Sequence, residues 1–330
     1  MKRIIIVLLS SVSALKAQDP QFTQFYATPL FLNPAFTGLT YEHRFTAAYR
    51  NQWPGIKKTY TTYMAAYDYN LSDLNSGVGG FVLQDIAGTA NLITTQFGLN
   101  YAYRFKIDKN TEVRAGLQMG MHQKRISFDR LVFNDQLITG SSRSRDASQT
   151  EPVNYFDAGV GGLLNSTNYW IGVSAKHLNQ PNVSLMGNIE PLPLFFSVHG
   201  GYRYIISARG SNKSKIEEYV SASVHYRHEL RYDQLDFGAY YFYKFINLGV
   251  WYRGLPYKKY KPGYPTRESL ALLIGLEVPD KNLRIGYSYD LTLSDLKINN
   301  TQGAHEVTLI YELAKKNKRT KRVLVTCPKF

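Results

Sequence analysis

Histidine is the residue type in this sequence with the widest chemical range, and seven histidines are present. His225 and His228 are three residues apart, a spacing that places them on opposite faces of a strand, so they make a poor metal pair. No G-x-S-x-G motif presents a nucleophilic serine, and His305 beside Glu306 is interpreted as structural. We expect no catalytic, metal or cofactor site. The remaining histidines lack metal-ligand spacing: His43, His122, His177 and His199.

A run of basic residues near the C-terminus could bind an acidic partner. The formal charge is +14, yet residues 1–17 carry +3 and residues 314–330 carry +7, which leaves +4 for the body. This distribution counts against a nucleic-acid groove. The tail is either solvated and disordered or attracted to an acidic protein or anionic surface, and 323–326 could add to a partner's sheet edge. The basic candidates are Lys315, Lys316, Lys318, Arg319, Lys321 and Arg322.

The first 17 residues have the pattern of a secretory signal peptide. A charged start precedes the apolar run 4–9, and Ala17 marks the expected cleavage point. The run is shorter than the roughly 20 apolar residues that span a bilayer. A buried N-terminal helix is the alternative. The single cysteine, Cys327, excludes an intrachain disulfide.

Period-two alternation from about residue 44 to residue 313 predicts strands. Aromatic, strand-length segments with one apolar and one polar face favour a transmembrane barrel over a soluble sandwich. Leu99 is then predicted to face lipid and Asn100 a wet lumen, so arginine should be tolerated at 100 and not at 99. Segment 93–107 has Ile93, Thr95, Phe97, Leu99, Tyr101, Tyr103, Phe105 and Ile107 on one face and Thr94, Gln96, Gly98, Asn100, Ala102, Arg104 and Lys106 on the other.

The elements that position these residues are expected to form an all-β, antiparallel barrel of about 14 strands. Short turns and longer connections then alternate, with 207–216 as an exception, and both termini are expected in the periplasm. The longest connections are 126–152, 178–193, 254–267 and 292–302, and they should face outward. The expected strands are 44–53, 59–71, 77–86, 92–107, 111–123, 153–164, 169–177, 194–206, 217–229, 234–243, 246–253, 268–278, 281–291 and 303–313.

Residues 18–43 depart from the barrel pattern and form a leader, followed by the barrel 44–313 and the tail 314–330. Asn33 can cap a short helical turn that begins at Pro34 and ends at Gly38. The apolar content should make the leader pack in the lumen or across the periplasmic mouth, as a structural plug or a binding element. The candidate residues are Asp19, Pro20, Phe22, Phe25, Pro29, Leu30, Asn33, Pro34, Phe36 and Gly38.

The leader is also where the chain resembles a known family. The runs Asp19–Phe25, Pro29–Leu30 and Asn33–Gly38 resemble the opening of the PorP/SprF family of the type IX secretion system. The resemblance continues through Gln52-Trp53-Pro54, His177-Leu178-Asn179-Gln180-Pro181, Ser288-Tyr289-Asp290, Leu293-Ser294 and Gly303-Ala304-His305-Glu306. It ends at Cys327, Pro328, Lys329 and Phe330, which join the tail candidates; lysine at 329 stands where arginine is expected.

The resemblance implies a Bacteroidetes outer-membrane protein that helps to secrete large adhesins and to hold them at the cell surface, often in gliding motility. Implied partners are an adhesin with a C-terminal sorting domain, other secretion components in the outer membrane, and periplasmic ring or peptidoglycan-linked lipoproteins, besides membrane lipid. One alternative is a porin or solute channel. A weaker one is a surface hydrolase. The channel would be lined by Arg104, Lys106, Arg114, Arg284 and Asp290.

Overall fold

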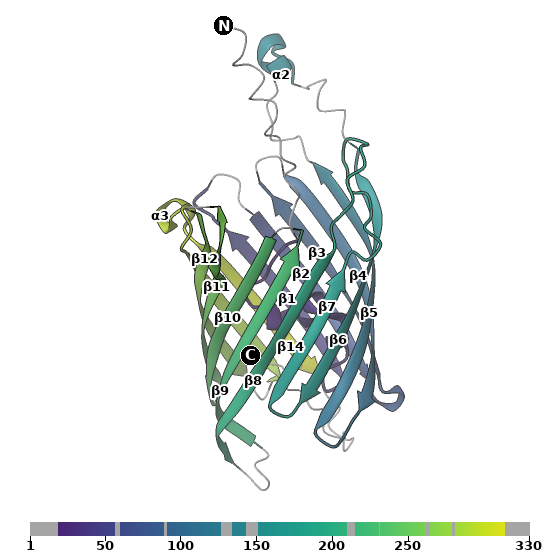
Figure 1. Ribbon diagram of the computed structural model, residues 1–330, viewed down its shortest axis with the longest axis vertical. Helices are drawn as coiled ribbons and strands as arrows, with labels where there is room; N and C mark the ends of the chain where they lie inside the picture. Colours follow the sequence, from purple (N-terminus) through teal and green to yellow (C-terminus); the bar gives the residue numbers. More distant parts are fainter. Residues whose placement is uncertain are drawn as a thin grey trace.

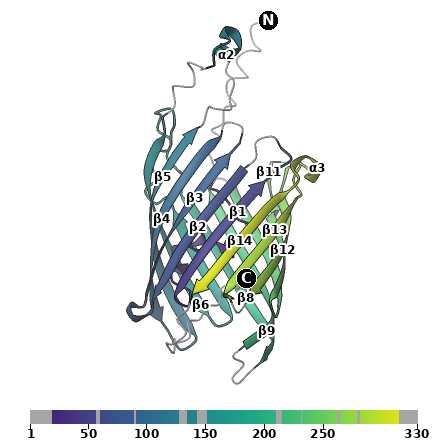
Figure 2. The same cartoon turned by 180° about the vertical axis from the view of Figure 1, so that it is seen from behind.

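The chain forms a closed antiparallel β-barrel of 14 strands (Figure 1). The computed structural model describes residues 19–56, 60–88, 91–126, 134–142, 151–209, 215–230, 232–261, 264–278 and 281–313. Each strand pairs with its sequence neighbours, and β1 closes the ring against β14 over ten residue pairs from His43–Leu313 to Gln52–Ala304 (Figure 2). The predicted fold class is confirmed.

The strands lie close to their predicted positions. They are β1 His43–Gln52, β2 Tyr60–Leu71, β3 Ser76–Ala87, β4 Leu92–Lys106, β5 Thr111–Ile126, β6 Val153–Ser166, β7 Tyr169–Lys176, β8 Phe195–Arg209, β9 Lys215–Glu229, β10 Tyr232–Tyr243, β11 Ile246–Lys261, β12 Tyr264–Val278, β13 Leu283–Thr292 and β14 Ala304–Leu313.

The connections define two different ends of the barrel. At the turn end, β1 begins and β14 ends, and a single 3-10 turn, η3 (Ser72–Leu74), joins β2 to β3. At the loop end, longer connections contain α2 (Asn134–Thr139) and α3 (Ile298–Thr301). The prediction of a long connection at 254–267 is wrong. There β11 and β12 continue as paired strands with register shifts, because Thr266 still pairs with Leu255.

The barrel wall places its apolar side chains outward and its polar side chains inward, the reverse of a soluble barrel. In β4, Leu99 is 74% exposed and Asn100 is 4% exposed, and β4 alternates in this way from Gln96 to Phe105. Outward apolar and aromatic side chains suit the acyl chains of a bilayer, and inward polar side chains suit a lumen. Among the described residues, no helix is long and apolar enough to cross a membrane.

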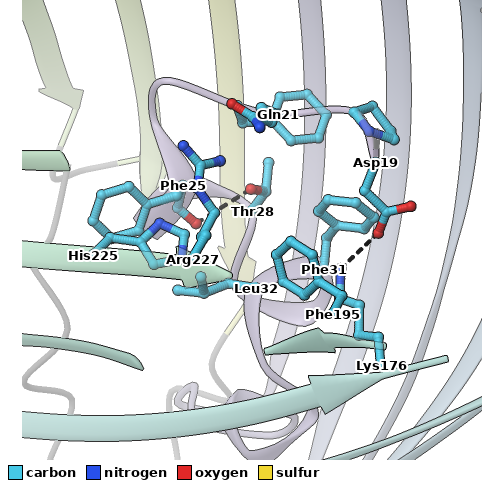
Figure 3. A pocket seen from close by; sticks show the side chains of 12 residues that line it. Asp19, Gln21, Phe25, Thr28, Phe31, Leu32, Lys176, Phe195, His225 and Arg227 are labelled. Atoms are coloured by element: carbon cyan, nitrogen blue, oxygen red, sulfur yellow. Dashed lines mark hydrogen bonds and ion pairs between the residues drawn. The ribbon is translucent and has the colours of Figure 1, made fainter. Parts of the chain in front are cut away.

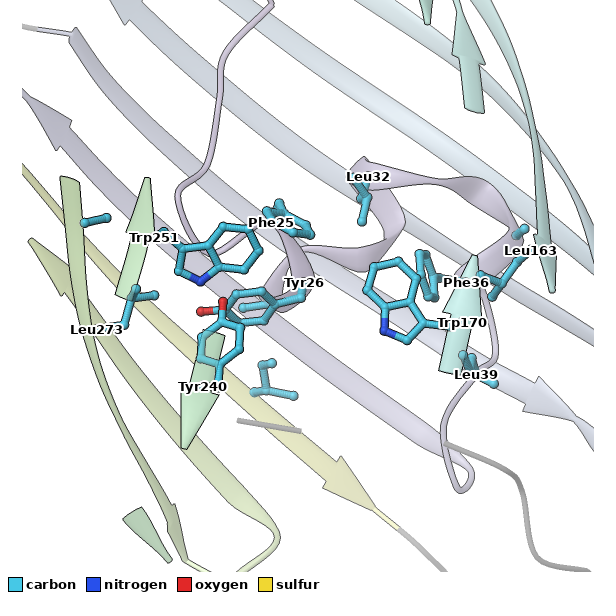
Figure 4. Packing of buried hydrophobic residues seen from close by; sticks show 14 residues of the cluster. Phe25, Tyr26, Leu32, Phe36, Leu39, Leu163, Trp170, Tyr240, Trp251 and Leu273 are labelled. Atoms are coloured by element: carbon cyan, nitrogen blue, oxygen red, sulfur yellow. The ribbon is translucent and has the colours of Figure 1, made fainter. Parts of the chain in front are cut away.

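The leader runs through the lumen rather than across a mouth (Figure 4). It contains η1 (Phe25–Ala27), α1 (Pro29–Leu32) and η2 (Pro34–Phe36), and the chain then reaches β1 at the turn end. Asp19 lies at the loop end, where its carboxylate is 3.2 Å from Nε2 of His177, the residue after β7.

This course separates the two ends of the described chain. Asp19 and Leu313 lie at opposite ends of the barrel, so the expectation that leader and tail face the same side does not hold for the described residues. The physical reason is that an even strand count places only His43 and Leu313 together. It does not determine the direction in which the leader enters the lumen.

Candidate functional site: the lumen and its leader

The leader turns in short helical steps because proline and asparagine prevent it from forming a strand. Pro29 begins α1 and Pro34 begins η2, where a missing N–H costs nothing. Asn33 caps η2, since its Oδ1 accepts from the backbone N–H of Ala35 at 2.8 Å. Gly38 follows with φ +71°, a conformation that a side chain would strain. The capped turn predicted here is confirmed.

Glycines in the wall let the leader backbone come close. A Cβ on Gly116 would collide with the backbone of Pro34 and Ala35, and a Cβ on Gly161 would collide with the Asn33 side chain. Both glycines lie inside strands, β5 and β6, where glycine otherwise weakens a strand. The missing side chains provide the space in which η2 sits against the wall.

A buried ionic network holds the first part of the leader, and we call it the upper network: Arg50, Arg253, Asp290 and Glu306. Thr23 donates its hydroxyl to Asp290 at 2.7 Å, and its backbone N–H donates to Glu306 at 2.7 Å. Arg50 bridges Asp290 at 2.9 Å and Glu306 at 3.1 Å. Arg253 reaches Asp290 at 3.1 Å. Each wall charge has an opposite charge beside it, which burial requires.

A second network binds the last part of the leader near the turn end. Arg44 forms a bidentate pair with Asp68 at 2.8 and 2.9 Å, and Asp68 also accepts from the Gly38 N–H at 2.8 Å. Arg114 donates to the carbonyl oxygens of Ala35, at 2.9 Å, and Thr37. The leader is therefore fixed through its backbone at both ends, a form of recognition that tolerates few shifts in register.

Aromatic side chains fill the space between the two networks (Figure 4). Phe25 meets Trp251 edge-on at 5.0 Å between ring centroids, and Phe36 meets Trp170 at 5.7 Å. Both tryptophans are 1% exposed. Edge-to-face pairs of this kind each add about 0.5–1.5 kcal/mol beyond the area they bury. They give the lumen an apolar core.

At the loop end of the barrel, the start of the leader forms a cluster of charges with the wall (Figure 3). His177 lies between Asp19, at 3.2 Å, and Asp157, at 3.0 Å. Burial alone would lower the pKa of His177, but the charges and hydrogen bonds of the two carboxylates raise it to about 10. Burial alone would raise the pKa of Asp19, but His177 and Lys176 hold it well below its usual range. The pair is therefore ionised at neutral pH.

The histidines divide between the two faces of the wall. His225 is 3% exposed and faces the lumen, while the His228 side chain is 46% exposed, as their spacing predicted. His199 is the register partner of His225, a juxtaposition that the sequence spacing does not reveal. Within the described part of the chain, no group of three or more His, Cys, Asp or Glu residues could hold a metal ion.

The structure brings the leader candidates together in the lumen. All ten leader residues line the lumen; Asp19 and Pro20 are partly buried and the other eight are buried. Residues 1–17, the expected signal peptide, and residues 314–330, with all ten tail candidates, lie outside the described residues. The sequence reasoning missed Arg50, Arg253 and Glu306 as leader contacts. Charged residues and glycines on the polar face of several strands were the available signal, because the glycines leave space for a packed segment and the charges supply its hydrogen-bond partners.

Several residues expected to line a wet pore instead have protein partners. Arg114 and Asp290 bind the leader, and Arg284 pairs with Glu312 at 2.6 Å. Asn100 donates to the carbonyl oxygen of Leu30 at 3.0 Å. The prediction that Asn100 faces a wet lumen is therefore wrong, because the leader lies against this part of the wall; tolerance of arginine there stays a prediction.

These features define a class: an outer-membrane β-barrel whose lumen is crossed by its own N-terminal segment. Among solved structures, the chain is similar to Omp33 of Acinetobacter baumannii, with 8% identity, TM-score 0.45 and coverage of 84% of this chain and 100% of that one. It is also similar to the toluene transporter TodX of Pseudomonas putida, with 12% identity, TM-score 0.42 and coverage of 86% and 92%.

The sequence, compared with models of protein families, identifies the family. The family model described as the type IX secretion system membrane protein PorP/SprF matches residues 14–311. The chain therefore belongs to the PorP/SprF family, and the resemblance seen in the leader is confirmed. No curated protein gives a significant match.

Proposed function

We propose that this protein is a non-enzymatic outer-membrane component of the type IX secretion system that helps to export large adhesins and retains them at the cell surface. The observation that carries the proposal is the leader, which is held across the lumen by hydrogen bonds to buried ion pairs of the wall and by backbone contacts. A pore for solutes gains nothing from such a segment. An attachment point needs a rigid barrel without a free passage.

The orientation is part of the proposal. With the longer connections outward, the loop end faces the cell exterior, and the Leu313 end of β14 faces the periplasm. The signal peptide is removed after Ala17, and the basic tail 314–330 then extends into the periplasm. There it reaches the ring or peptidoglycan-linked lipoproteins of the secretion machinery, while the loop end is left for the adhesin.

Single-channel recording separates this function from that of a solute channel. The purified barrel in a planar bilayer should show no steady conductance. Arg253→Met, which removes one hydrogen-bond partner of the leader, should produce openings. A steady open pore in the wild-type protein would rule out the attachment role.

A co-purification experiment tests the tail. The intact protein and a version that lacks residues 315–330 are isolated from outer membranes, and the bound proteins are identified. Periplasmic secretion components should be lost from the truncated version, while the adhesin stays bound. Equal recovery of every partner would show that the tail plays no part in assembly.

A further inference from the structure

The hairpin that joins β8 to β9 reaches further out from the turn end of the barrel than the other described connections there (Figure 1). It corresponds to the connection 207–216, the exception among the expected short turns. β8 continues to Arg209, β9 begins at Lys215, and these two residues are the last register pair of the two strands. The hairpin therefore extends the sheet beyond the closed wall.

On one side of this hairpin, β7 stops well before β8 does. The register of β7 with β8 ends at the pair Tyr169–Tyr202. One further hydrogen bond runs from the backbone N–H of Arg203 to the carbonyl oxygen of Asn168, at 2.7 Å. Within the part of the chain that the structure describes, no strand pairs with β8 beyond this point on the β7 side. Residues 204–209 therefore form a free edge about 20 Å long, at roughly 3.3 Å per residue.

The direction of the backbone groups identifies a hydrogen-bond donor on this edge. Successive residues of a strand point their N–H and C=O groups to opposite sides, so Ile205 points the same way as Arg203. Arg203 donates toward β7, and Ile205 lies beyond the end of β7. The backbone N–H and C=O of Ile205 are thus open to an added strand. On the other side of the hairpin, backbone contacts follow β9 as far as Glu217, so less edge is left there.

Two apolar side chains lie along the same edge. Tyr204 is 63% exposed and Ile206 is 50% exposed. Ile206 has no register partner in β9, because the pairing passes from Ile205 to Ser207 through a bulge. A bulge bends the strand, and two strands without a third are marginally stable in water. A third strand on this edge would give Tyr204 and Ile206 cross-strand neighbours.

The charge of the hairpin distinguishes between possible occupants of the edge. Residues 207–216 contain Arg209, Lys213 and Lys215 and no acidic residue. A second copy of the chain would bring the same three positive charges to the edge, and the tail 314–330 would bring seven. Both would be repelled, since like charges on paired strands are destabilising. An acidic segment of another protein would be attracted.

We propose that the free edge of β8, residues 204–209, binds an extended acidic segment of a partner protein by addition of a β-strand. Backbone hydrogen bonds to Ile205 hold the segment, and its acidic side chains lie toward the basic tip of the hairpin. In the proposed orientation the partner is periplasmic. The inference does not depend on the secretion role, because it follows from strand pairing and charge.

Fluorescence anisotropy with the purified full-length barrel in neutral detergent tests the edge. The first probe is a labelled octapeptide of alternating valine and glutamate. The second is the same peptide with every backbone nitrogen methylated, and the third has lysine in place of glutamate. The first should bind with one equivalent per barrel. The other two should bind at least about tenfold more weakly, because methylation removes the backbone donors and lysine is repelled by the hairpin.

A proline on the free edge tests the site from the side of the barrel. Ile205→Pro removes an N–H that points away from β9, and edge strands tolerate proline at such positions. The variant should keep its melting temperature and bind the acidic peptide at least about tenfold more weakly. Lys109→Gln is the matched control, because Lys109 lies at the same end in the turn between β4 and β5. It should leave peptide binding unchanged.

Four results would overturn the proposal. No binding of the acidic peptide by the intact barrel would do so directly. Equal binding of the methylated and unmethylated peptides would reduce the contact to attraction between charges. Binding that appears only after deletion of residues 315–330 would show that the edge holds the chain's own tail. Dimers of the barrel that Ile205→Pro abolishes would identify a second copy as the occupant.

Discussion

The two faces of the barrel wall are made from the same strands, yet they obey opposite rules. On the outside, Leu99, Phe97 and Leu117 are more than half exposed, whereas on the inside Arg50 and Glu306 are at most 2% exposed. The outer face needs only apolar character, because lipid does not demand a specific partner. The inner face needs matched pairs, because each buried charge must meet its counter-charge or a leader atom. Substitutions should therefore be tolerated differently on the two faces.

The largest difference is expected at the upper network. Arg50→Met leaves Glu306 and Asp290 with fewer partners in a buried site, so the free energy of unfolding should fall by about 3–5 kcal/mol. Glu218→Gln, on the exposed hydrogen bond with Tyr241, should change the free energy of unfolding far less. Urea unfolding in detergent gives both values. Similar losses of stability in both variants would mean that the buried ion pairs contribute no more than an exposed contact.

A charge on the outer face should have the next largest effect. Leu99→Arg places a cation toward lipid in the middle of β4 and should cost roughly 2–4 kcal/mol, as a charge near the bilayer centre does. Asn100→Ala removes one hydrogen bond to the leader and should cost about 0.5–1.5 kcal/mol. The folded fraction after refolding into lipid vesicles reports both changes. A greater loss at position 100 would reverse the assignment of the faces.

Neighbouring glycines of β6 provide a matched steric pair. Gly161→Val drives a side chain into Asn33 and should destabilise the barrel by about 1–3 kcal/mol. A Cβ on Gly162 meets only a Val173 methyl at 3.6 Å, so Gly162→Val should be nearly neutral. Thermal unfolding distinguishes the two variants when the folded and unfolded barrels are separated by their mobility on a gel. Equal melting would indicate that the leader does not press against this strand.

The smallest expected effect is a dependence on pH of the stability of the leader at its Asp19 end. Since the pKa of His177 is raised from 6.5 to about 10, its contribution to stability should be complete below pH 6.5 and be lost as pH rises through about 10. Protease cleavage near Asp19 should therefore increase in that range. Asp19→Asn should weaken the pH dependence and leave the part that Asp157 maintains. A profile identical to that of wild type would show that another group controls this end.

Sequence reasoning worked well where a pattern repeats along the chain. Alternation in β4 and β14 identified the strands and their faces, because a residue's side of a strand follows from its parity alone. The capped turn at Asn33–Pro34 was equally local. The prediction was wrong where a distant pairing decided the structure. At 254–267 the two strands extend further than expected, and at Asn100 the leader occupies the space expected to hold water.

The sequence by itself determined a barrel with an atypical apolar leader, since period-two patterning, proline positions and residue types are properties of neighbouring residues. Only the tertiary structure decided that the leader enters from the loop end and binds Arg50, Arg114 and Asp290. Those contacts join residues between 27 and 267 positions apart, from Thr23 with Arg50 to Thr23 with Asp290. Their pairing depends on closure of the ring, which brings β1 and β14 together and encloses the lumen in which His225 and Arg227 share one cavity.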